Sequence, residues 1–185
     1  KTRLIPALGA KTAIDVHKRL LKRTLAVLQT SATGTVQLWW DQHWDSQSFL
    51  SDFKEKPQQC EQLGKDLGER MQHAIVSGLA DFHKVLLVGS DCPVLDSAYL
   101  QCALSLLDQF DTVLGPSDDG GYVLIGAQKF CSNVLRGIPW GTSAVLADTV
   151  SRFQHFRLSY AQLPPLYDVD EVGDYKRWQS EENWQ

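Results

Sequence analysis

Acidic side chains follow three separate extended segments of this chain, at positions where they could bind a metal ion. They are Asp91, the pair Asp118 and Asp119, and the pair Asp168 and Asp170. Carboxylate oxygens are the ligands that Mg²⁺ and Mn²⁺ prefer, and Mg²⁺ commonly shares them with the phosphates of a substrate. The three acidic loops therefore favour a site for a divalent cation bound together with a phosphorylated ligand.

Asp91 is the most specific of these residues. It follows the run 85–88, Val-Leu-Leu-Val, which has no polar face and so predicts a central parallel strand covered on both sides. Ligands of open α/β sheets bind beyond the carboxyl ends of such strands, and helix capping does not explain a carboxylate there. Asp118, in contrast, stands in Ser-Asp-Asp-Gly-Gly, which is good turn chemistry by itself.

Candidate phosphate ligands are scattered along the chain. Gly120 and Gly121 offer backbone N–H groups with no Cβ in the way, although a tight turn that needs positive φ explains them equally well. Lys1, Arg3 and Arg70 could supply positive charge, although most surface cations are only solvated. Each of these residues alone is a weak indication of a nucleotide site.

Aromatic and histidine side chains say less about chemistry. Trp140 lies in the segment 138–143, a loop that could close over a sugar or base by stacking, with ordinary core packing as the alternative. The five histidines are scattered and belong to no recognisable nucleophile motif, so we expect core or surface roles for them.

Composition excludes several classes of protein. Net charge is −4, from 18 basic and 22 acidic residues, and no basic patch emerges, which argues against nucleic acid as the partner. The four cysteines form no CxxC pair, which indicates free thiols and a cytoplasmic protein. No apolar run approaches the roughly 18 residues of a membrane span. Neither a GxGxxG fingerprint nor a GxxxxGK[ST] phosphate loop is present.

Alternating segments predict one doubly wound α/β domain over residues 1–185. We expect a loop at 1–10, helices at 11–31, 64–82, 96–108, 143–154 and 171–179, and strands or extended segments at 35–40, 84–89, 111–116, 122–126 and 156–163. Residues 41–62 have no clear period and predict only loop and short helix. Asp96 and Thr142 are expected N-caps. The segment 111–126 indicates at least one strand that breaks the parallel pattern.

Six segments, taken in order, resemble a bacterial family of GT-A-like, glycosyltransferase-like proteins in the nucleotide-diphospho-sugar transferase superfamily. They are Lys1–Leu4, Asp66–Met71, Gly89–Pro93, Leu114–Tyr122, Ile138–Ser143, and Tyr167–Asp170 followed by Asp174. The resemblance runs from residue 1 to about residue 178. It implies a three-layer α/β/α fold with a mixed, mostly parallel sheet, and nucleotide chemistry assisted by Mg²⁺ or Mn²⁺.

The resemblance also implies roles for particular residues. Asp91 would lie nearest the metal and the diphosphate, Lys1 and Arg3 would end the nucleotide-binding loop, and Asp168 or Asp170 would approach the metal from the other side. Asp119, Gly120 and Gly121 would line the acceptor or sugar side. The family's first strand and most of its nucleotide-binding loop would precede Lys1, so this chain is expected to lack both. Gly89 stands where many glycosyltransferases carry the first Asp of an Asp-x-Asp signature.

These residues and the resemblance together predict a metal-dependent transferase. It would use a nucleotide-activated donor, foremost a sugar nucleotide, and a small-molecule acceptor. Asp119 would orient or deprotonate the acceptor hydroxyl. Two alternatives stay open. One is a nucleotidyltransferase that joins a nucleoside triphosphate to a phosphorylated small molecule, and the other is a non-catalytic nucleotide-binding protein.

Overall fold

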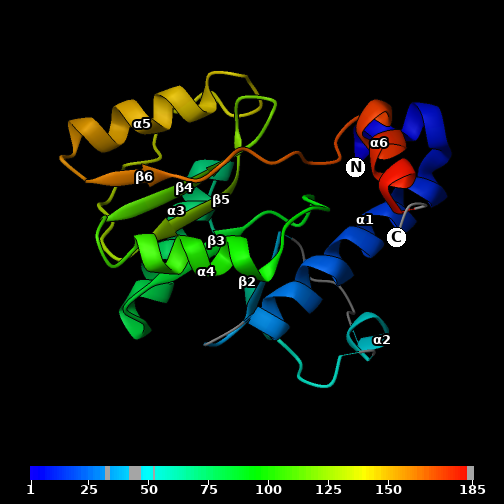
Figure 1. The fold of residues 1–185 in the computed structure, drawn as a ribbon, viewed down its shortest axis with the longest axis horizontal. Coiled ribbons are helices and arrows are strands. Elements are labelled where there is room, and N and C mark those ends of the chain that lie inside the picture. The colour runs from blue at the N-terminus through cyan, green and yellow to red at the C-terminus, as the bar shows by residue number, and fades with distance from the viewer. Residues whose placement is uncertain (32–33, 42–46, 52, 183–185) are drawn as a thin grey trace.

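A computed structural model describes residues 1–31, 34–41, 47–51 and 53–182, and strands alternate with helices along most of them (Figure 1). The elements are a short 3-10 helix η1 (Thr2–Leu4), α1 (Ile5–Ser31), β1 (Gln37–Trp40), α2 (Gln47–Leu50), β2 (Gln58–Glu61), α3 (Leu67–Asp81), β3 (Val85–Val88), α4 (Ser97–Leu106), β4 (Thr112–Pro116), β5 (Tyr122–Ala127), α5 (Val145–His155), β6 (Tyr160–Gln162) and α6 (Val172–Glu182).

The strands form two sheets. The larger sheet has the order β3-β5-β4-β6, with β5 antiparallel to both β3 and β4, and with β4 parallel to β6. Strands β3, β4 and β6 therefore run in one direction and β5 in the other, so the segment 111–126 does contain the strand that breaks the pattern. A second, smaller sheet consists of the parallel pair β1 and β2.

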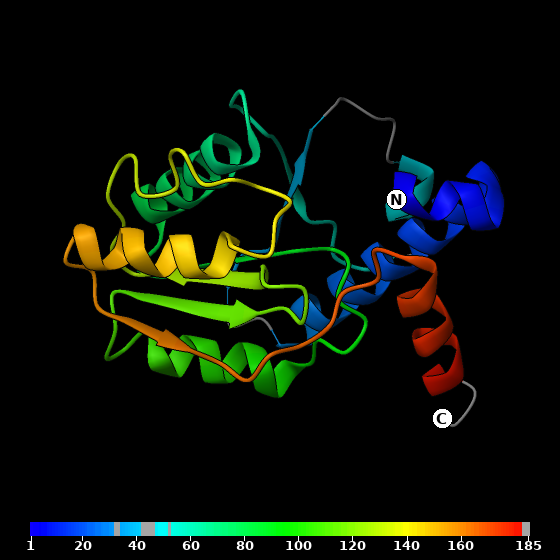
Figure 2. The same ribbon diagram turned by 90° about the horizontal axis from the view of Figure 1, so that it is seen from above.

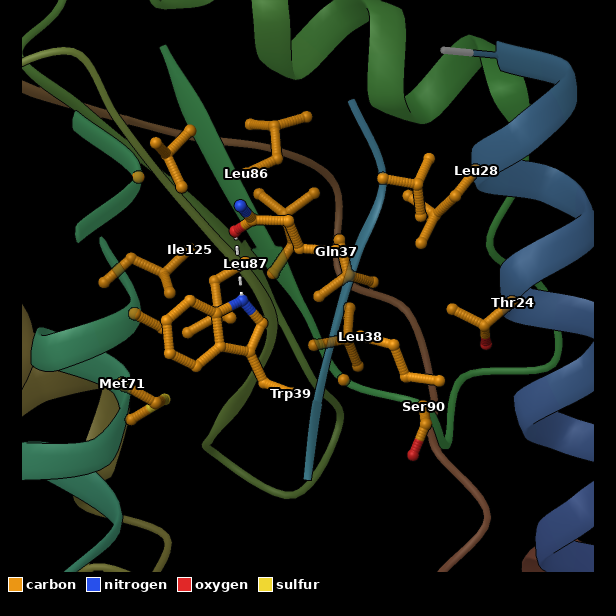
Figure 3. A pocket seen from close by; sticks show the side chains of 18 of the residues that line it. Thr24, Leu28, Gln37, Leu38, Trp39, Met71, Leu86, Leu87, Ser90 and Ile125 are labelled. Atoms are coloured by element: carbon orange, nitrogen blue, oxygen red, sulfur yellow. Dashed lines mark hydrogen bonds between the residues drawn. The ribbon is translucent and has the colours of Figure 1, made fainter. Parts of the chain in front are cut away.

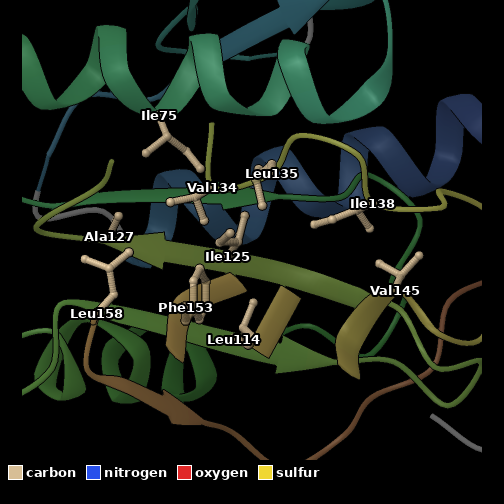
Figure 4. Packing of buried hydrophobic residues seen from close by; sticks show 10 residues of the cluster. All are labelled: Ile75, Leu114, Ile125, Ala127, Val134, Leu135, Ile138, Val145, Phe153 and Leu158. Atoms are coloured by element: carbon tan, nitrogen blue, oxygen red, sulfur yellow. The ribbon is translucent and has the colours of Figure 1, made fainter. Parts of the chain in front are cut away.

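Helices cover both faces of the larger sheet (Figure 2). On one face, Ile75 of α3 and Phe153 of α5 pack with Leu114 and Ile125 of the sheet (Figure 4). On the other face, a second core is centred on α4, and the carboxyl-terminal half of α1 joins it through Val27 and Leu28. This arrangement confirms the three-layer α/β/α fold.

A third apolar cluster lies outside the sheet. It joins α1 to α6, through Val16 and Leu20 on one helix and Tyr175 and Trp178 on the other. Figures 1 and 2 both show the start of α1 and α6 beyond one end of the sheet. Hydrogen bonds described below place this end at the carboxyl ends of β3 and β4, where the acidic loops lie.

The amino-terminal prediction needs correction. Residues 1–10 are not a loop, because η1 and the first turns of α1 occupy them. Pro6 lies in the first turn of α1, where a missing N–H group costs little. Gly9, at φ 76° and ψ 158°, kinks the helix, so α1 is two helical segments joined end to end. Ile14 is 54% exposed, whereas Ala13 and Val16 on the same helix are buried.

Two further elements differ from the predictions. β2 falls within 41–62, where no strand was expected, because its residues Gln-Gln-Cys-Glu carry no apolar signal. The helix predicted from 143 begins at Val145, and its N-cap is Ala144 rather than Thr142. The Thr142 hydroxyl accepts a hydrogen bond from the Ala144 N–H at 3.3 Å and donates to the Pro139 carbonyl. In contrast, Asp96 does cap α4, since its carboxylate accepts a hydrogen bond from the Tyr99 N–H at 2.8 Å.

The strand β3 is the most consequential difference. Its four apolar residues are only half-buried, although they predict a central strand covered on both sides. Within the described residues β3 pairs with β5 alone and forms the edge of the larger sheet. Its other edge borders a cavity, which is described below.

Candidate functional site

Hydrogen bonds join three loops at the carboxyl ends of β3 and β4. The Val169 N–H donates to the Asp91 carbonyl at 3.0 Å, and the Asp118 N–H donates to the Leu166 carbonyl at 2.9 Å. The Leu166 N–H in turn donates to the Pro116 carbonyl at 3.0 Å. The common direction of β3, β4 and β6 is the cause, because it brings the segments that follow these strands to the same edge of the sheet. The acidic loops 89–93, 117–121 and 166–170 are therefore neighbours.

An ion pair between Lys1 and Asp91 lies at the centre of this arrangement. The Lys1 ammonium is 2.9 Å from an Asp91 carboxylate oxygen, and the two side chains are 4% and 38% exposed. The ammonium also donates to the carbonyl of Val169. A buried ammonium needs such partners, because an unpaired buried charge is strongly unfavourable. Lys1 thus lies between two of the three loops.

Asp168 carries the clearest electrostatic signature of the site. Burial, and then the nearby Asp119 carboxylate, raise the pKa of Asp168 to about 6. Asp91 raises the pKa further, while Lys1 lowers it. Carboxylates from the other two loops and the Lys1 ammonium are therefore within electrostatic reach of Asp168, and the carboxylates outnumber the ammonium. Such an excess of negative charge favours a cation.

Asp119 is exposed and held in one orientation. One carboxylate oxygen accepts hydrogen bonds from the Ser117 hydroxyl and from the Gly121 N–H, the latter at 2.9 Å. Gly120 has a φ of +88°, and a Cβ there would come 2.3 Å from the Ser143 carbonyl oxygen. The positive φ and the close packing against the segment before α5 therefore fit the tight turn, the alternative that explains Gly120 without a ligand.

Arg3 and Asp170 lie on the rim and pair with each other. Their closest nitrogen and oxygen atoms are 2.6 Å apart, and both side chains are exposed. The Asp170 N–H also donates to the Asp174 carboxylate at 3.1 Å, at the start of α6. None of these contacts brings the Asp170 carboxylate to Asp91, whereas the neighbouring Asp168 lies within electrostatic reach of it.

The contacts described for Trp140 and Arg70 involve neither Lys1 nor Asp91. The Trp140 ring packs edge-on against Tyr122, with centroids 6.3 Å apart, and touches Gly68 so closely that a Cβ there would be 2.8 Å from the indole nitrogen. These contacts are ordinary core packing, the alternative to a stacking role. Arg70 donates to the Gly64 carbonyl at 3.3 Å and lines the cavity beside β3.

His17 is a site residue that the sequence did not indicate. Its Nδ1 atom lies 3.9 Å from the Asp91 carboxylate. Burial lowers the pKa of His17, Asp91 opposes this, and the Lys1 α-amino group and ammonium add to it. The helical spacing could have indicated that His17 lies near the buried face of the helix. His17 stands next to Val16 and four residues before Leu21, and both of these residues are buried.

A cavity of about 910 Å³ extends from this site along β3, and we call it the slot. Helices α1 and α3 lie on its two sides, and residues of β1 and β3 line it (Figure 3). Ser90, Asp91 and His17 line its polar end. Apolar side chains line much of the rest, among them Leu21, Leu28, Val36, Leu38, Leu86 and Val88.

The carboxylates fit one kind of metal site and not another. Within the described parts of the chain, no three or more His, Cys, Asp or Glu side chains are grouped so that they could hold a metal ion. A closed structural site is therefore not formed there. Asp91 and Asp168 are two carboxylates that influence each other, and one or two carboxylates suffice where Mg²⁺ is held together with substrate phosphates.

The fold and the site edge define a class, and a solved structure supports it. The chain has the three-layer architecture of nucleotide-diphospho-sugar transferases. A crystal structure from Desulfovibrio desulfuricans, provisionally named a nucleotide-diphospho-sugar transferase, superposes with a TM-score of 0.84 at 33% sequence identity, over 92% of this chain and 76% of that one. The chain belongs to the bacterial family described as "Uncharacterized protein conserved in bacteria (DUF2064)", whose sequence pattern matches residues 24–142.

More distant structures share the fold alone. The bifunctional IspDF from Campylobacter jejuni has a TM-score of 0.59 at 12% identity, over 85% of this chain and 46% of that chain. Rv0371c from Mycobacterium tuberculosis has a TM-score of 0.55 at 15% identity, over 87% and 83% of the two chains. A search of curated proteins finds no match. Among the described residues, no helix has the length and apolarity needed to cross a membrane.

Proposed function

We propose that the protein is a transferase that takes a group from a nucleotide-activated donor, foremost a sugar nucleotide, with the help of Mg²⁺ or Mn²⁺. The meeting of the three hydrogen-bonded loops that bear Asp91, Asp119 and Asp168, with Lys1 paired to Asp91, carries this proposal. A diphosphate alone would be repelled by three carboxylates, whereas a diphosphate with a divalent cation complements them. The provisional name of the Desulfovibrio desulfuricans protein supports the same chemistry.

The residues of the site would have different roles according to their positions. Asp91 and Asp168 would hold the cation, which when bound supplies Lewis acidity and a template for the diphosphate. The Lys1 ammonium, already fixed by Asp91 and the Val169 carbonyl, would lie beside a phosphate oxygen and stabilise the negative charge that develops there. Arg3 would reach the outer phosphate from the rim after leaving Asp170.

Asp119 is our candidate for the acceptor side. It is exposed, and the Ser117 hydroxyl and the Gly121 N–H fix one of its oxygens. A carboxylate held in this way can orient an acceptor hydroxyl or take its proton. Its influence on the pKa of Asp168 supports a position near the proposed cation, as transfer between a bound donor and an acceptor requires.

A donor screen tests the proposal. The purified protein would be incubated with Mn²⁺ and, in separate reactions, with a panel of sugar nucleotides and small hydroxyl acceptors, or with nucleoside triphosphates and sugar phosphates. We expect release of a nucleoside diphosphate from one sugar nucleotide. Release of pyrophosphate from a triphosphate would establish nucleotidyl transfer instead. Tight nucleotide binding with no turnover of any donor would make the protein a binding protein.

A further inference from the structure

Arg177, on α6, contacts two of the loops that carry the candidate carboxylates. Its guanidinium donates to the Asp118 carboxylate at 3.4 Å, and the guanidinium carbon lies 3.7 Å from the centre of the Tyr167 ring. Asp118 is the residue before Asp119, and Tyr167 is the residue before Asp168. One side chain therefore contacts the immediate neighbours of two candidate site residues.

Two partners hold this guanidinium in place. Tyr167 is 4% exposed and belongs to the apolar cluster that joins α1 to α6, so its ring is a fixed surface. Glu181, four residues further along α6, accepts hydrogen bonds from Arg177 Nε at 3.4 Å and from the Tyr167 hydroxyl. A planar guanidinium can stack on a ring while its edge donates to carboxylates. Arg177 is therefore held with one outer nitrogen toward Asp118.

The loop 117–121 is attached to the segment before α6 at a second point. The Asp118 N–H donates to the Leu166 carbonyl at 2.9 Å. Figure 2 shows that the chain passes from β6 to α6 along this side of the sheet. The loop itself holds the Asp119 carboxylate through two hydrogen bonds, as described above. The two attachments of the loop therefore determine where that carboxylate lies relative to Asp168.

The contact between Arg177 and Asp118 lies at the surface. The two side chains are 52% and 56% exposed, and exposed ion pairs contribute little to the free energy of unfolding. Loss of the contact should therefore leave the fold intact while it releases one of the two attachments of the loop. A role in placing the loop can thus be separated by experiment from a role in stability.

We propose that Arg177 is a positioning residue, which holds the loop 117–121 against the segment 166–170 and so fixes Asp119 relative to Asp168. The catalytic consequence rests on the proposed function, in which Asp119 faces the acceptor and Asp168 the cation. A displacement of about 1 Å between reacting groups can lower a rate about a hundredfold. The placement of the loop is a property of the folded chain and does not depend on that function.

Two arginine variants test the placement. Arg177→Gln removes the charge and the stacked guanidinium. Arg19→Gln is the matched control, because Arg19 is also about half exposed, pairs with Glu182 of α6 at 2.6 Å, and lies 4.8 Å from the centroid of the Trp178 ring. Asp118→Asn keeps an oxygen that can accept the hydrogen bond from Arg177, so this substitution should not release the loop.

Amide hydrogen exchange, measured by NMR without any ligand, reports on the placement. The hydrogen bonds of the Asp118 and Gly121 amides attach and close the loop, whereas the Tyr175 amide is bonded at the start of α6. We expect Arg177→Gln to exchange at least threefold faster at Asp118 and Gly121, with Tyr175 and the melting temperature unchanged. Arg19→Gln should match wild type at all three amides. Unchanged loop amides in Arg177→Gln would overturn the inference, and so would equally faster exchange at Tyr175.

Steady-state kinetics tests the catalytic consequence. With a donor that wild type turns over, Arg177→Gln should lower kcat at least fivefold and leave the KM for the donor within twofold, while Arg19→Gln matches wild type. Because Arg177 would act through Asp119, the double variant Arg177→Gln/Asp119→Asn should be no slower than Asp119→Asn alone. A raised KM with unchanged kcat, or losses that multiply in the double variant, would overturn the positioning role.

The two experiments keep this inference apart from the proposed function. If wild type turns over no donor, the proposed function fails, and amide exchange still decides whether Arg177 places the loop. If wild type is active but the loop amides and kcat of Arg177→Gln are unchanged, the proposed function stands and the role of Arg177 fails.

Discussion

Two regions of the larger sheet, the paired strands β4 and β5 and the edge strand β3, differ sharply in burial, although their strands have similar composition. Every residue of β4 is buried, and so is every residue of β5 except Tyr122, because helices cover both faces and paired strands cover both edges. The four residues of β3, Val-Leu-Leu-Val, are as apolar but only half-buried. An apolar run thus predicts a buried strand, but the neighbouring strands in the sheet determine whether the strand is buried.

The candidate site lies across the boundary between these two regions. Asp119 and Asp168 come from loops next to β4, β5 and β6, the part of the sheet with paired edges, which we call the closed region. Asp91, Lys1 and His17 lie instead at the polar end of the slot. We therefore expect truncation of buried apolar side chains in β4 and β5 to act on stability, and changes at the polar end of the slot to act first on binding.

A pair of identical truncations gives the largest expected difference. Leu114→Ala removes a side chain that is 0% exposed between α3 and α5, so it should cost about 2–5 kcal/mol of unfolding free energy. Leu86→Ala, on the slot side, should cost less than half as much because water already reaches Leu86. Urea unfolding of both variants measures this, and equal losses would break the comparison.

Asp119→Asn tests the acceptor role within the closed region. Turnover should fall at least tenfold, because general acid–base catalysis commonly contributes two or more orders of magnitude, while donor binding stays unchanged. Asp118→Asn is the matched control, since that neighbouring carboxylate contacts Arg177 at 3.4 Å and points to α6. Turnover of Asp119→Asn within a few-fold of wild type would remove the role.

Asp168 predicts a smaller, pH-dependent effect on stability. Its pKa in the folded protein, about 6, lies above the ordinary value of 3.8, so the folded state favours the protonated carboxyl. This contribution is present at pH 4 and is lost as the pH rises through 6. Asp168→Asn should therefore gain melting temperature relative to wild type at pH 7 but not at pH 4. A difference in melting temperature that does not change with pH would contradict the raised pKa of Asp168.

The rim pair predicts the smallest effect. Arg3 and Asp170 are both exposed, and exposed ion pairs contribute about 0–1 kcal/mol. Asp170→Asn should leave the melting temperature within about one degree of wild type and should change Mn²⁺ affinity less than threefold, as isothermal calorimetry would measure. A larger loss of Mn²⁺ affinity would show that Asp170 is a metal ligand.

Much of this architecture can be predicted from the sequence because local patterns determine it. Apolar runs mark β3, β4 and β5, the carboxylate of Asp96 marks the start of α4, and acidic residues after the strands mark the edge that carries the site. The resemblance to the nucleotide-diphospho-sugar transferases rests on the same segments, and the fold confirms it.

Features that depend on distant residues could not be predicted. The bond between Lys1 and the Val169 carbonyl spans 168 positions, and the approach of His17 to Asp91 depends on how α1 packs. β2 has polar residues, and its pairing is with β1, a partner that its own composition does not indicate. The free edge of β3 depends on which strand lies next to it, and composition does not contain that information.

Metal-dependent nucleotide binding is the most direct test of the proposed site. Calorimetry would titrate UDP and GDP, each with and without Mn²⁺, into wild type, Asp91→Ala and Asp108→Ala. Asp108 is the control, because it pairs with Lys84 near the end of α4. We predict that Mn²⁺ tightens binding of one nucleotide at least tenfold in wild type and in Asp108→Ala, and that Asp91→Ala abolishes this gain. An unchanged gain in Asp91→Ala would contradict the site.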